Sequence, residues 1–387
     1  MNRTLFFFNS ILFFTCGFSV VTIIVLSAYL KEALDLNWEQ AAVIQAGYFL
    51  GYLIFCPIIG FIFNKNLNQS LLQIALGFSC ISVSGVLWGA RLSSYPLIAF
   101  SVFGMGSAMA VIHTVATPLA FLQGGASRVT LMQAMMSLGQ ISAPILGAFS
   151  MLAVLGVNPT LHASETPFDV IFFLFFLLFL ASFGNFFQSS ERSFEKNRGA
   201  FPYKIALIGV LAMVLAMGAE VCEASFLVPL ISQSTQSPLA IGGYISSLYW
   251  FSLFAGRLFG AWALHSIKPA RLMFLYTFIG TALSLTTAIA GGLISAIAAI
   301  CLGFSASILF PIVFSLVLLE SPSYKRELAG LLLMTNGCGG LLAYVMGRTA
   351  DVTGLQISYL LVSSMYVLLM LLSIYFIRRQ IKVESHI

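Results

Sequence analysis

The sequence predicts an all-helical protein that crosses a membrane about twelve times, and three observations support this prediction. Of its 387 residues, 59% are hydrophobic and only 8% are charged, whereas an ordinary soluble domain carries roughly 25% charged residues. Apolar runs near or above 18 residues recur along the whole chain, and each is long enough for a spanning helix. Lysine and arginine gather in alternate connections between these runs, as in a chain that threads back and forth through a bilayer.

Twelve apolar segments are expected to span the membrane, and the alternating pattern of an outer-membrane barrel does not occur. Taken in order, the segments cover 5–30, 40–64, 69–90, 95–122, 128–155, 167–187, 203–232, 239–265, 270–290, 291–319, 327–349 and 355–377. The first runs on to about Leu30 without a small-residue cleavage site. We therefore expect it to remain as a span and not to be removed as a signal peptide.

The positive charges predict which side of the membrane is cytoplasmic. Of the 18 Lys and Arg residues, 14 fall on the side that also holds both termini, 3 fall on the opposite side, and Arg257 lies within a span. Cytoplasmic connections carry the excess of Lys and Arg, so both termini are expected in the cytoplasm. The net charge of +5 follows from this topology and needs no nucleic-acid partner.

The longest polar connection divides the chain into two sets of six segments. We expect an N-terminal six-helix bundle over 1–187, a cytoplasmic linker over 188–202, a C-terminal six-helix bundle over 203–378 and a cytoplasmic tail over 379–387. Glycines recur at an offset of 200 positions in the two halves: Gly60 and Gly260, Gly139 and Gly339, Gly147 and Gly347. Their common offset indicates an internal repeat.

Two carboxylates, Glu220 and Glu223, lie inside the seventh segment. An acid at the centre of a spanning helix costs roughly 2.5 to 3.5 kcal/mol, so it usually faces a water-filled path, a partner or a proton that it holds. Their i, i+3 spacing places both on one helix face. We interpret them as proton-coupling residues. The alternative is a structural ion pair, or a protonated acid bonded to a neighbouring helix.

His113 and Arg257 are the other ionisable residues within segments to which we assign a role. Imidazole titrates near neutrality, so His113 can relay a proton or pair with a carboxylate. Its structural alternative is a neutral ring bonded to a backbone carbonyl or to the hydroxyl of Thr117. Arg257 lies about two turns inside the cytoplasmic end of the eighth segment, and pairing at an inward gate is favoured there over substrate contact.

Six polar or aromatic side chains are candidate substrate contacts: Gln133, Ser137, Gln140, Tyr249, Trp250 and Asn336. The first three follow one face of the fifth segment, a stripe that suits a hydroxylated solute but would also serve bonds between helices. An aromatic ring in the eighth segment can stack on the apolar face of a sugar, although packing in the core or against lipid explains it equally. Glycines surround Asn336 and favour close helix packing.

Several stretches resemble the fucose/glucose-galactose proton symporter family of the major facilitator superfamily. They are Gly47-Tyr-Phe-Leu-Gly-Tyr52 with Pro57-Ile-Ile-Gly60, Gly104-Met-Gly106 with Thr117-Pro118, Gln133 with Ser137-Leu-Gly139, Gly218-Ala-Glu220 with Ser225-Phe-Leu-Val228, Ser247-Leu-Tyr-Trp250 with Gly256-Arg-Leu-Phe-Gly260, and Phe310-Pro-Ile-Val-Phe-Ser315. The resemblance implies two parallel six-helix halves with a substrate site near the membrane midplane. It also implies a multi-pass protein of the bacterial inner membrane that works as a monomer.

The chain departs from this family where its proton chemistry resides. The acid expected in the first segment is absent from Val21-Thr-Ile-Ile-Val25, and His113 stands where the fourth segment should carry an acid. The amide expected in the fifth segment falls near Met136. A fucose-type proton site therefore cannot be transferred to this chain, and Gln133 is the matching polar residue that we retain.

These observations together predict a secondary transporter that moves a small polar solute, with a sugar favoured, across the inner membrane with proton coupling by alternating access. The expected partners are the solute, the proton and membrane lipid. The chain has no phosphate-binding loop, and its six cysteines lie in apolar segments without ligand spacing, so no enzyme, cofactor or metal site is expected. The alternative is proton-driven import or export of an amino acid, organic acid or siderophore-like compound. A membrane receptor or scaffold that transports nothing is the rival from another class.

Overall fold

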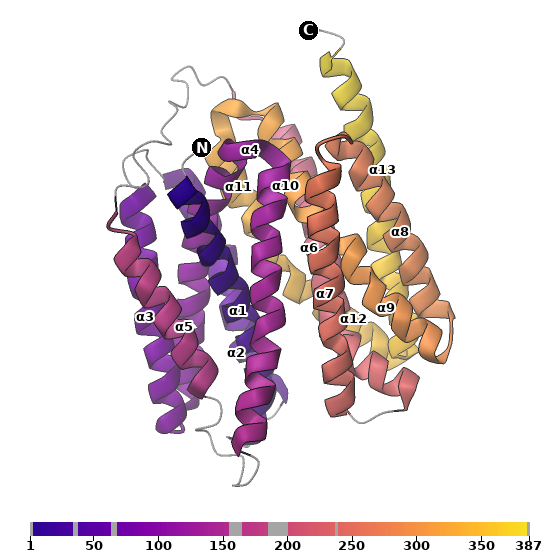
Figure 1. Ribbon diagram of the computed structural model, residues 1–387. Coiled ribbons are helices and arrows are strands. Elements are labelled where there is room, and N and C mark those ends of the chain that lie inside the picture. Colours follow the sequence, from indigo (N-terminus) through magenta and orange to yellow (C-terminus); the bar gives the residue numbers. More distant parts are fainter. Residues whose placement is uncertain are drawn as a thin grey trace. The chain divides into compact units, whose positions relative to one another are not determined.

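The structure, a computed structural model, describes residues 3–33, 38–62, 68–154, 165–184, 200–236 and 239–384. Within these residues all regular structure is helical (Figure 1). The helices are α1 (Arg3–Ala33), α2 (Trp38–Ile62), α3 (Asn68–Arg91), α4 (Tyr95–Val154), α5 (Glu165–Ala181), α6 (Tyr203–Thr235), α7 (Leu239–Ala263), α8 (Pro269–Ile289), α9 (Gly292–Ala306), α10 (Leu309–Glu320), the short 3-10 turn η3 (Pro322–Tyr324), α11 (Lys325–Leu333), α12 (Thr335–Thr353) and α13 (Leu355–Glu384).

Breaks in the helices fall at glycine and near proline. The long α4 loses helical backbone at Gly124 and Gly125, where the fourth expected segment gives way to the fifth. Gly125 has φ of 60°, a conformation that glycine adopts without steric cost. The tenth expected segment is divided between α9 and α10, and the eleventh between α11 and α12. The expected linker 188–202 lies outside the described residues except for 200–202, as does 385–387 of the expected tail.

The described helices have the surface of a membrane protein. Eight of them, or joined pairs of them, are long and apolar enough to cross a bilayer, and two shorter apolar helices cover Ala46–Phe61 and Thr166–Ala181. Large apolar side chains such as Phe100, Trp262 and Ile289 point outward. Many serine and threonine side chains are instead buried, and most of those bond to a carbonyl of their own helix one turn back, as Thr15 and Ser19 do.

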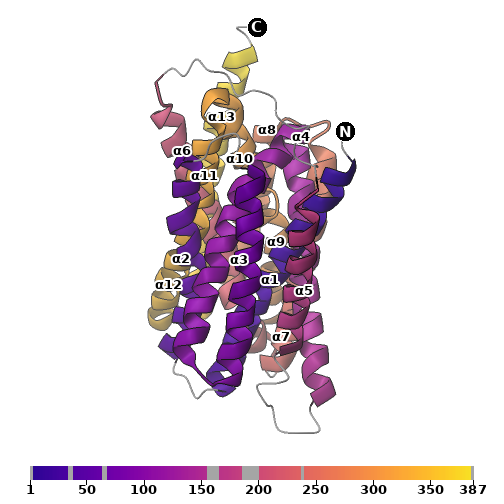
Figure 2. The same ribbon diagram turned by 90° about the vertical axis from the view of Figure 1, so that its left-hand side faces the viewer.

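The chain divides into two compact units. The first comprises Met1–Gln123, Met135–Glu195 and Ala329–Gly337, and the second comprises Gly124–Ala134, Lys196–Leu328 and Cys338–Ile387. In the first unit, α3 packs against α5, and α1 packs against α2 and α5 (Figures 1 and 2). In the second unit, α13 packs against α8 and α6, while α9 packs against α6, α7 and α8.

Close approaches of backbone to backbone at glycine recur in the two halves of the sequence. A side chain on Gly106 would collide with the carbonyl of Tyr48 in the first unit, and one on Gly303 would meet the carbonyl of Tyr249 in the second. Gly139 faces the Phe14 carbonyl in the same way. Only a residue without Cβ permits such contacts between helices. Gly106 and Gly303 are 197 positions apart and not 200, so the internal repeat indicated by the glycine spacing stays a prediction.

Candidate functional site

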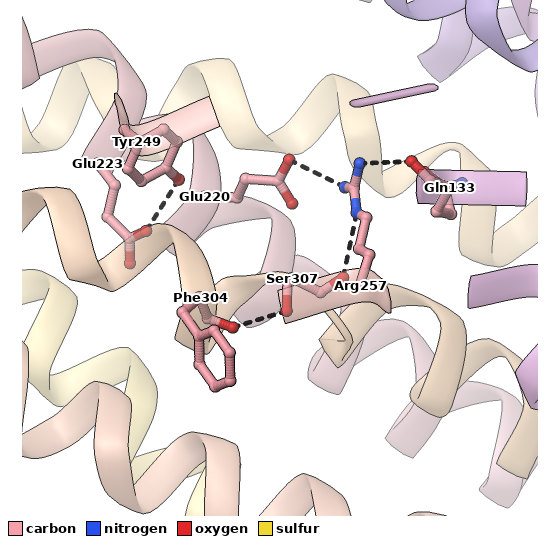
Figure 3. A network of polar contacts seen from close by, with 7 residues as sticks. All are labelled: Gln133, Glu220, Glu223, Tyr249, Arg257, Phe304 and Ser307. Carbon is pink, nitrogen blue, oxygen red and sulfur yellow. Dashed lines mark hydrogen bonds and ion pairs between the residues drawn. The ribbon is translucent and has the colours of Figure 1, made fainter. Parts of the chain in front are cut away.

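Arg257 is the centre of a buried polar network in the second unit (Figure 3). Its Nη2 lies 3.6 Å from Glu220 Oε1, and the arginine side chain is only 3% exposed. Nη1 donates a hydrogen bond of 2.9 Å to the backbone carbonyl of Gln133, and Nε donates one of 3.2 Å to that of Ser307. The guanidinium on α7 therefore holds together α4, α6 and the break between α9 and α10.

The carbonyl of Ser307 is available to Arg257 because of a proline. In a continuous helix this carbonyl would accept from the N–H of residue 311, but Pro311 has no N–H to donate. The Ser307 hydroxyl donates to the Phe304 carbonyl at 2.6 Å, which satisfies a second group at the break. The proline in the tenth predicted segment thus creates an acceptor within the apolar interior, and Arg257 occupies it.

Glu223, one turn beyond Glu220 on α6, has different partners. It is 1% exposed. Tyr249 of α7 donates to Oε2 at 3.0 Å, and Tyr366 of α13 donates to Oε1 at 2.8 Å. Each carboxylate oxygen therefore has one hydroxyl donor, and the partners that the structure gives Glu223 are neutral. Two carboxylates on one helix face consequently occupy two environments, one paired with a cation and one not.

This difference decides what the two acids can do chemically. A buried carboxylate without a cation carries a large desolvation cost, which hydroxyl donors offset only in part. Binding a proton removes that cost. Glu220 already has its charge compensated by Arg257, so taking up a proton there would break an ion pair. Glu223 is therefore suited to hold a proton, and Glu220 is suited to hold Arg257.

His113 lies in the first unit on α4. Its Nδ1 is 3.1 Å from the Tyr52 hydroxyl, and its ring stacks on Phe13 with centroids 5.6 Å apart. The structural alternatives expected for His113 were a bond to a backbone carbonyl or to the Thr117 hydroxyl. Nδ1 makes neither of these bonds. Its Nε2 has no hydrogen-bond partner within the described chain.

The candidate substrate contacts have mixed surroundings. Gln133, Ser137 and Gln140 are all buried on α4. Trp250 is half-buried and meets Tyr249 edge to face, with centroids 5.4 Å apart. Asn336 donates from Nδ2 to the Leu333 carbonyl at 2.8 Å. That bond satisfies a carbonyl at the end of α11, which gives this side chain a local structural task.

Sequence reasoning missed three partners in these networks. Tyr366 does not stand out, because it is one of 13 tyrosines in an aromatic-rich chain, although Tyr359 and Tyr366 stand two turns apart on α13. Tyr52 could be recognised only as part of a family motif. Pro311 was the feature of the sequence that could have revealed the free Ser307 carbonyl, because proline has no N–H to donate to it.

Within the described residues, no group of three His, Cys, Asp or Glu side chains is placed to hold a metal ion.

Comparison with known proteins gives consistent matches along the chain. Residues 6–344 match the family model described as Major Facilitator Superfamily. The chain is 26% identical over 366 residues to a glucose/galactose transporter of Brucella abortus (strain 2308), covering 91% of this chain and 89% of the relative. It is 25% identical over 361 residues to the L-fucose-proton symporter of Escherichia coli (strain K12), covering 84% and 82%.

A solved structure agrees in fold. The crystal structure of the major facilitator transporter FucP in the outward conformation superposes with a TM-score of 0.82 at 22% identity, covering 96% of this chain and 98% of that chain. The family model and the relatives confirm the resemblance predicted from the sequence. The expectation of a helical transporter rather than an enzyme is confirmed with it.

Proposed function

Since the chain belongs to the major facilitator superfamily, we propose that it is a secondary active transporter that carries a sugar together with protons by alternating access. Its substrate is a hexose of the glucose and galactose type. The relatives named as glucose/galactose transporters and as an L-fucose-proton symporter support this choice. Their similarity extends over most of both chains.

The proposed topology has twelve spans in two six-helix bundles, with both termini in the cytoplasm of a bacterium and the spans in its inner membrane. The asymmetry of Lys and Arg supports this orientation. The bundles cover 1–187 and 203–378, joined by a cytoplasmic linker. The protein works as a monomer, since superfamily members form the pathway within one chain between two repeats.

The environment of Glu223 is the observation that supports proton coupling. Its two oxygens accept hydrogen bonds from Tyr249 and Tyr366, and it is nearly fully buried without a cation among its given partners. In this proposal Glu223 takes up a proton on one side of the membrane and releases it on the other. Protonation makes the site neutral and lowers the cost of moving it through the apolar interior.

Glu220 and Arg257 form the gate in this proposal. The guanidinium joins Glu220, the Gln133 carbonyl and the Ser307 carbonyl in one cluster. Elements joined by such a cluster can separate only if its bonds break together. By pairing with Arg257, Glu220 helps to keep α6 and α7 together. Neutralising Glu220 would weaken this pair and loosen the gate.

The proposed sugar contacts are Gln133, Ser137 and Gln140 on α4, with Tyr249 and Trp250 on α7. Amide and hydroxyl groups can bond sugar hydroxyls, and the half-buried Trp250 offers a face for stacking. Asn336 is the weakest member, because its amide is engaged by the Leu333 carbonyl. His113 serves as a second protonatable group.

Uptake into proteoliposomes tests the proposal. Purified protein is reconstituted, and labelled D-glucose, D-galactose and L-fucose are supplied with the interior more alkaline than the exterior. We expect accumulation above equilibrium, abolished by a protonophore. Failure to accumulate any of these sugars, with gradient-driven uptake of an amino acid or organic acid instead, would establish the alternative substrate class.

A further inference from the structure

Three polar side chains in the first unit are buried with unpaired groups, namely Asn9 of α1 and His113 and Thr117 of α4. Their exposed fractions are 1%, 5% and 0%. Asn9 Nδ2 and Oδ1, His113 Nε2 and Thr117 Oγ1 have no hydrogen-bond partner within the described residues. Each such group destabilises the folded protein if nothing binds it, because its hydrogen bonds to water are lost and not replaced. Native interiors contain few of them, so several in one unit call for an occupant.

The hydroxyls next to these side chains are paired. Thr114, next to His113, donates to the Ala110 carbonyl at 2.7 Å, and Thr15 of α1 donates to the Ile11 carbonyl at 2.9 Å. Hydroxyls in apolar helices ordinarily bond back in this way. Thr117 makes no such bond back to its own helix. Its hydroxyl is fully buried and has no partner within the described chain.

The packing places Asn9 and Thr117 at one level, one helical turn from His113. Tyr48 of α2 faces Gly106, and Tyr52 bonds His113, so α2 and α4 run in the same direction. α1 packs against α2 and is separated from it by only the short connection 34–37, so α1 runs in the opposite direction.

The stacked rings of Phe13 and His113 fix the register between α1 and α4. Asn9 lies one turn before Phe13, and Thr117 lies one turn after His113. One turn is about 5.4 Å along the axis, and in antiparallel helices these two steps lead the same way. Asn9 and Thr117 therefore face a common region beside Nε2 of His113, toward the N-terminal end of α1.

The chemistry of this region suits water. An amide supplies two donors and an acceptor, a hydroxyl supplies both functions, and the role of Nε2 depends on the tautomer. These groups are neutral, and a buried water typically makes about three hydrogen bonds to otherwise unsatisfied groups. Among these three side chains a metal ion would find only Nε2 of His113 and two uncharged oxygens, with no carboxylate or thiolate to balance its charge, and a sugar ring needs more open surface than side chains exposed by 5% or less provide.

We propose that Asn9, His113 and Thr117 form a binding site for internal water that hydrates Nε2 of His113. The other titratable groups around the Tyr52 partner of His113 are Tyr48, Cys16 and Cys56, which are all neutral near pH 7. Resting on the proposed function, the site gives His113 a path for proton exchange toward the N-terminal end of α1.

Water-edited solid-state NMR on the full-length protein in lipid bilayers, labelled with ¹⁵N-histidine, tests this directly. The chain has four histidines, and the signal of His113 is assigned by its loss in His113→Phe. We expect fast magnetisation transfer from water to Nε2 of His113 in the wild type. Thr117→Val should slow this transfer severalfold, whereas the matched variant Thr114→Val should leave it unchanged. Absence of transfer in the wild type, or equal transfer in both threonine variants, would overturn the site.

Thermal unfolding provides a second measurement. If the region is dry, Thr117→Val and Asn9→Leu remove unsatisfied groups and raise the unfolding temperature. If water binds there, neither variant gains stability. Thr117→Val alone decides the question should Asn9→Leu fail to fold. Neither measurement involves transport, so the water site can fail while sugar uptake succeeds, and the reverse outcome is equally distinguishable.

Discussion

Arg257 and Glu220 form an ion pair of 3.6 Å in which the arginine is 3% exposed and the glutamate 15%. Figure 3 shows the guanidinium reaching Glu220 on one side and the Gln133 and Ser307 carbonyls on the others. One turn along α6, Glu223 is held by tyrosine hydroxyls instead. A single helix thus carries one acid compensated by a cation and one that binding a proton would neutralise.

The ion pair predicts strong coupling between its two members. Glu220→Gln leaves the guanidinium without its compensating charge, and Arg257→Gln leaves the carboxylate buried and unpaired, so each single change should destabilise by about 3 to 5 kcal/mol. Removing both avoids leaving a lone charge, so the double variant should lose clearly less than the sum of the single losses. Unfolding free energies in mixed detergent measure this cycle.

The Arg379 and Glu320 pair serves as the control for that cycle. Arg379 is 41% exposed and Glu320 17%, so water screens their interaction and its coupling should be about 1 kcal/mol or less. Equal coupling energies for the two pairs would contradict the role given to Arg257.

Replacing the tyrosines that bond Glu223 should change both the stability of the protein and the pH dependence of uptake. Tyr366→Phe and Tyr249→Phe each remove a donor to a buried carboxylate and should destabilise by about 1 to 3 kcal/mol. Both should also change the pH dependence of sugar uptake. Tyr276→Phe is the matched control, because this buried hydroxyl donates to the Gly256 carbonyl at 3.2 Å. It should lower stability without altering the pH profile, and a pH profile altered equally in all three would argue against Glu223 as the proton site.

The close contact of α1 with α4 predicts that Gly139 cannot be replaced. A methyl group there would collide with the Phe14 carbonyl, so Gly139→Ala should lower the unfolding temperature and the yield of folded protein. A methyl group on Gly340 would meet no atom of the described chain within 4 Å. Gly340→Ala should therefore be neutral or stabilise by up to about 1 kcal/mol, since alanine favours helix. Matching losses in both variants would refute the packing explanation.

Much of the fold could be predicted because hydrophobic runs and glycines mark helices and their ends. The break at Gly124 and Gly125 and the start of α9 at Gly292 fall at expected joints. The division of the tenth segment at Ser307 and Ile308 was not predicted, although Pro311 was an available signal for it. That stretch reads as one long apolar run with a few serines, and its break depends on Pro311 together with the arginine that binds the released carbonyl.

The candidate site was predicted in part for a similar reason. An ionisable residue in an apolar segment stands out, so Glu220, Glu223, His113 and Arg257 were all visible in the sequence. Their partners were not visible, because nothing in the sequence distinguishes a tyrosine such as Tyr366, which bonds an acid, from the aromatic residues around it that only pack. Which acid meets a cation depends on the rotation and approach of separate helices, and a single sequence does not contain that information in readable form.

The most direct test of the proton site is a comparison of two transport modes in the Glu223→Gln variant. Glutamine retains the size of the side chain and one accepting oxygen, and its amide NH2 can donate to the oxygen of the other tyrosine, but it cannot exchange a proton. We expect this variant to lose accumulation of labelled glucose driven by a pH gradient while it still exchanges labelled for unlabelled glucose across the membrane. Gradient-driven accumulation equal to that of the wild type would contradict the assignment of Glu223 as the proton carrier.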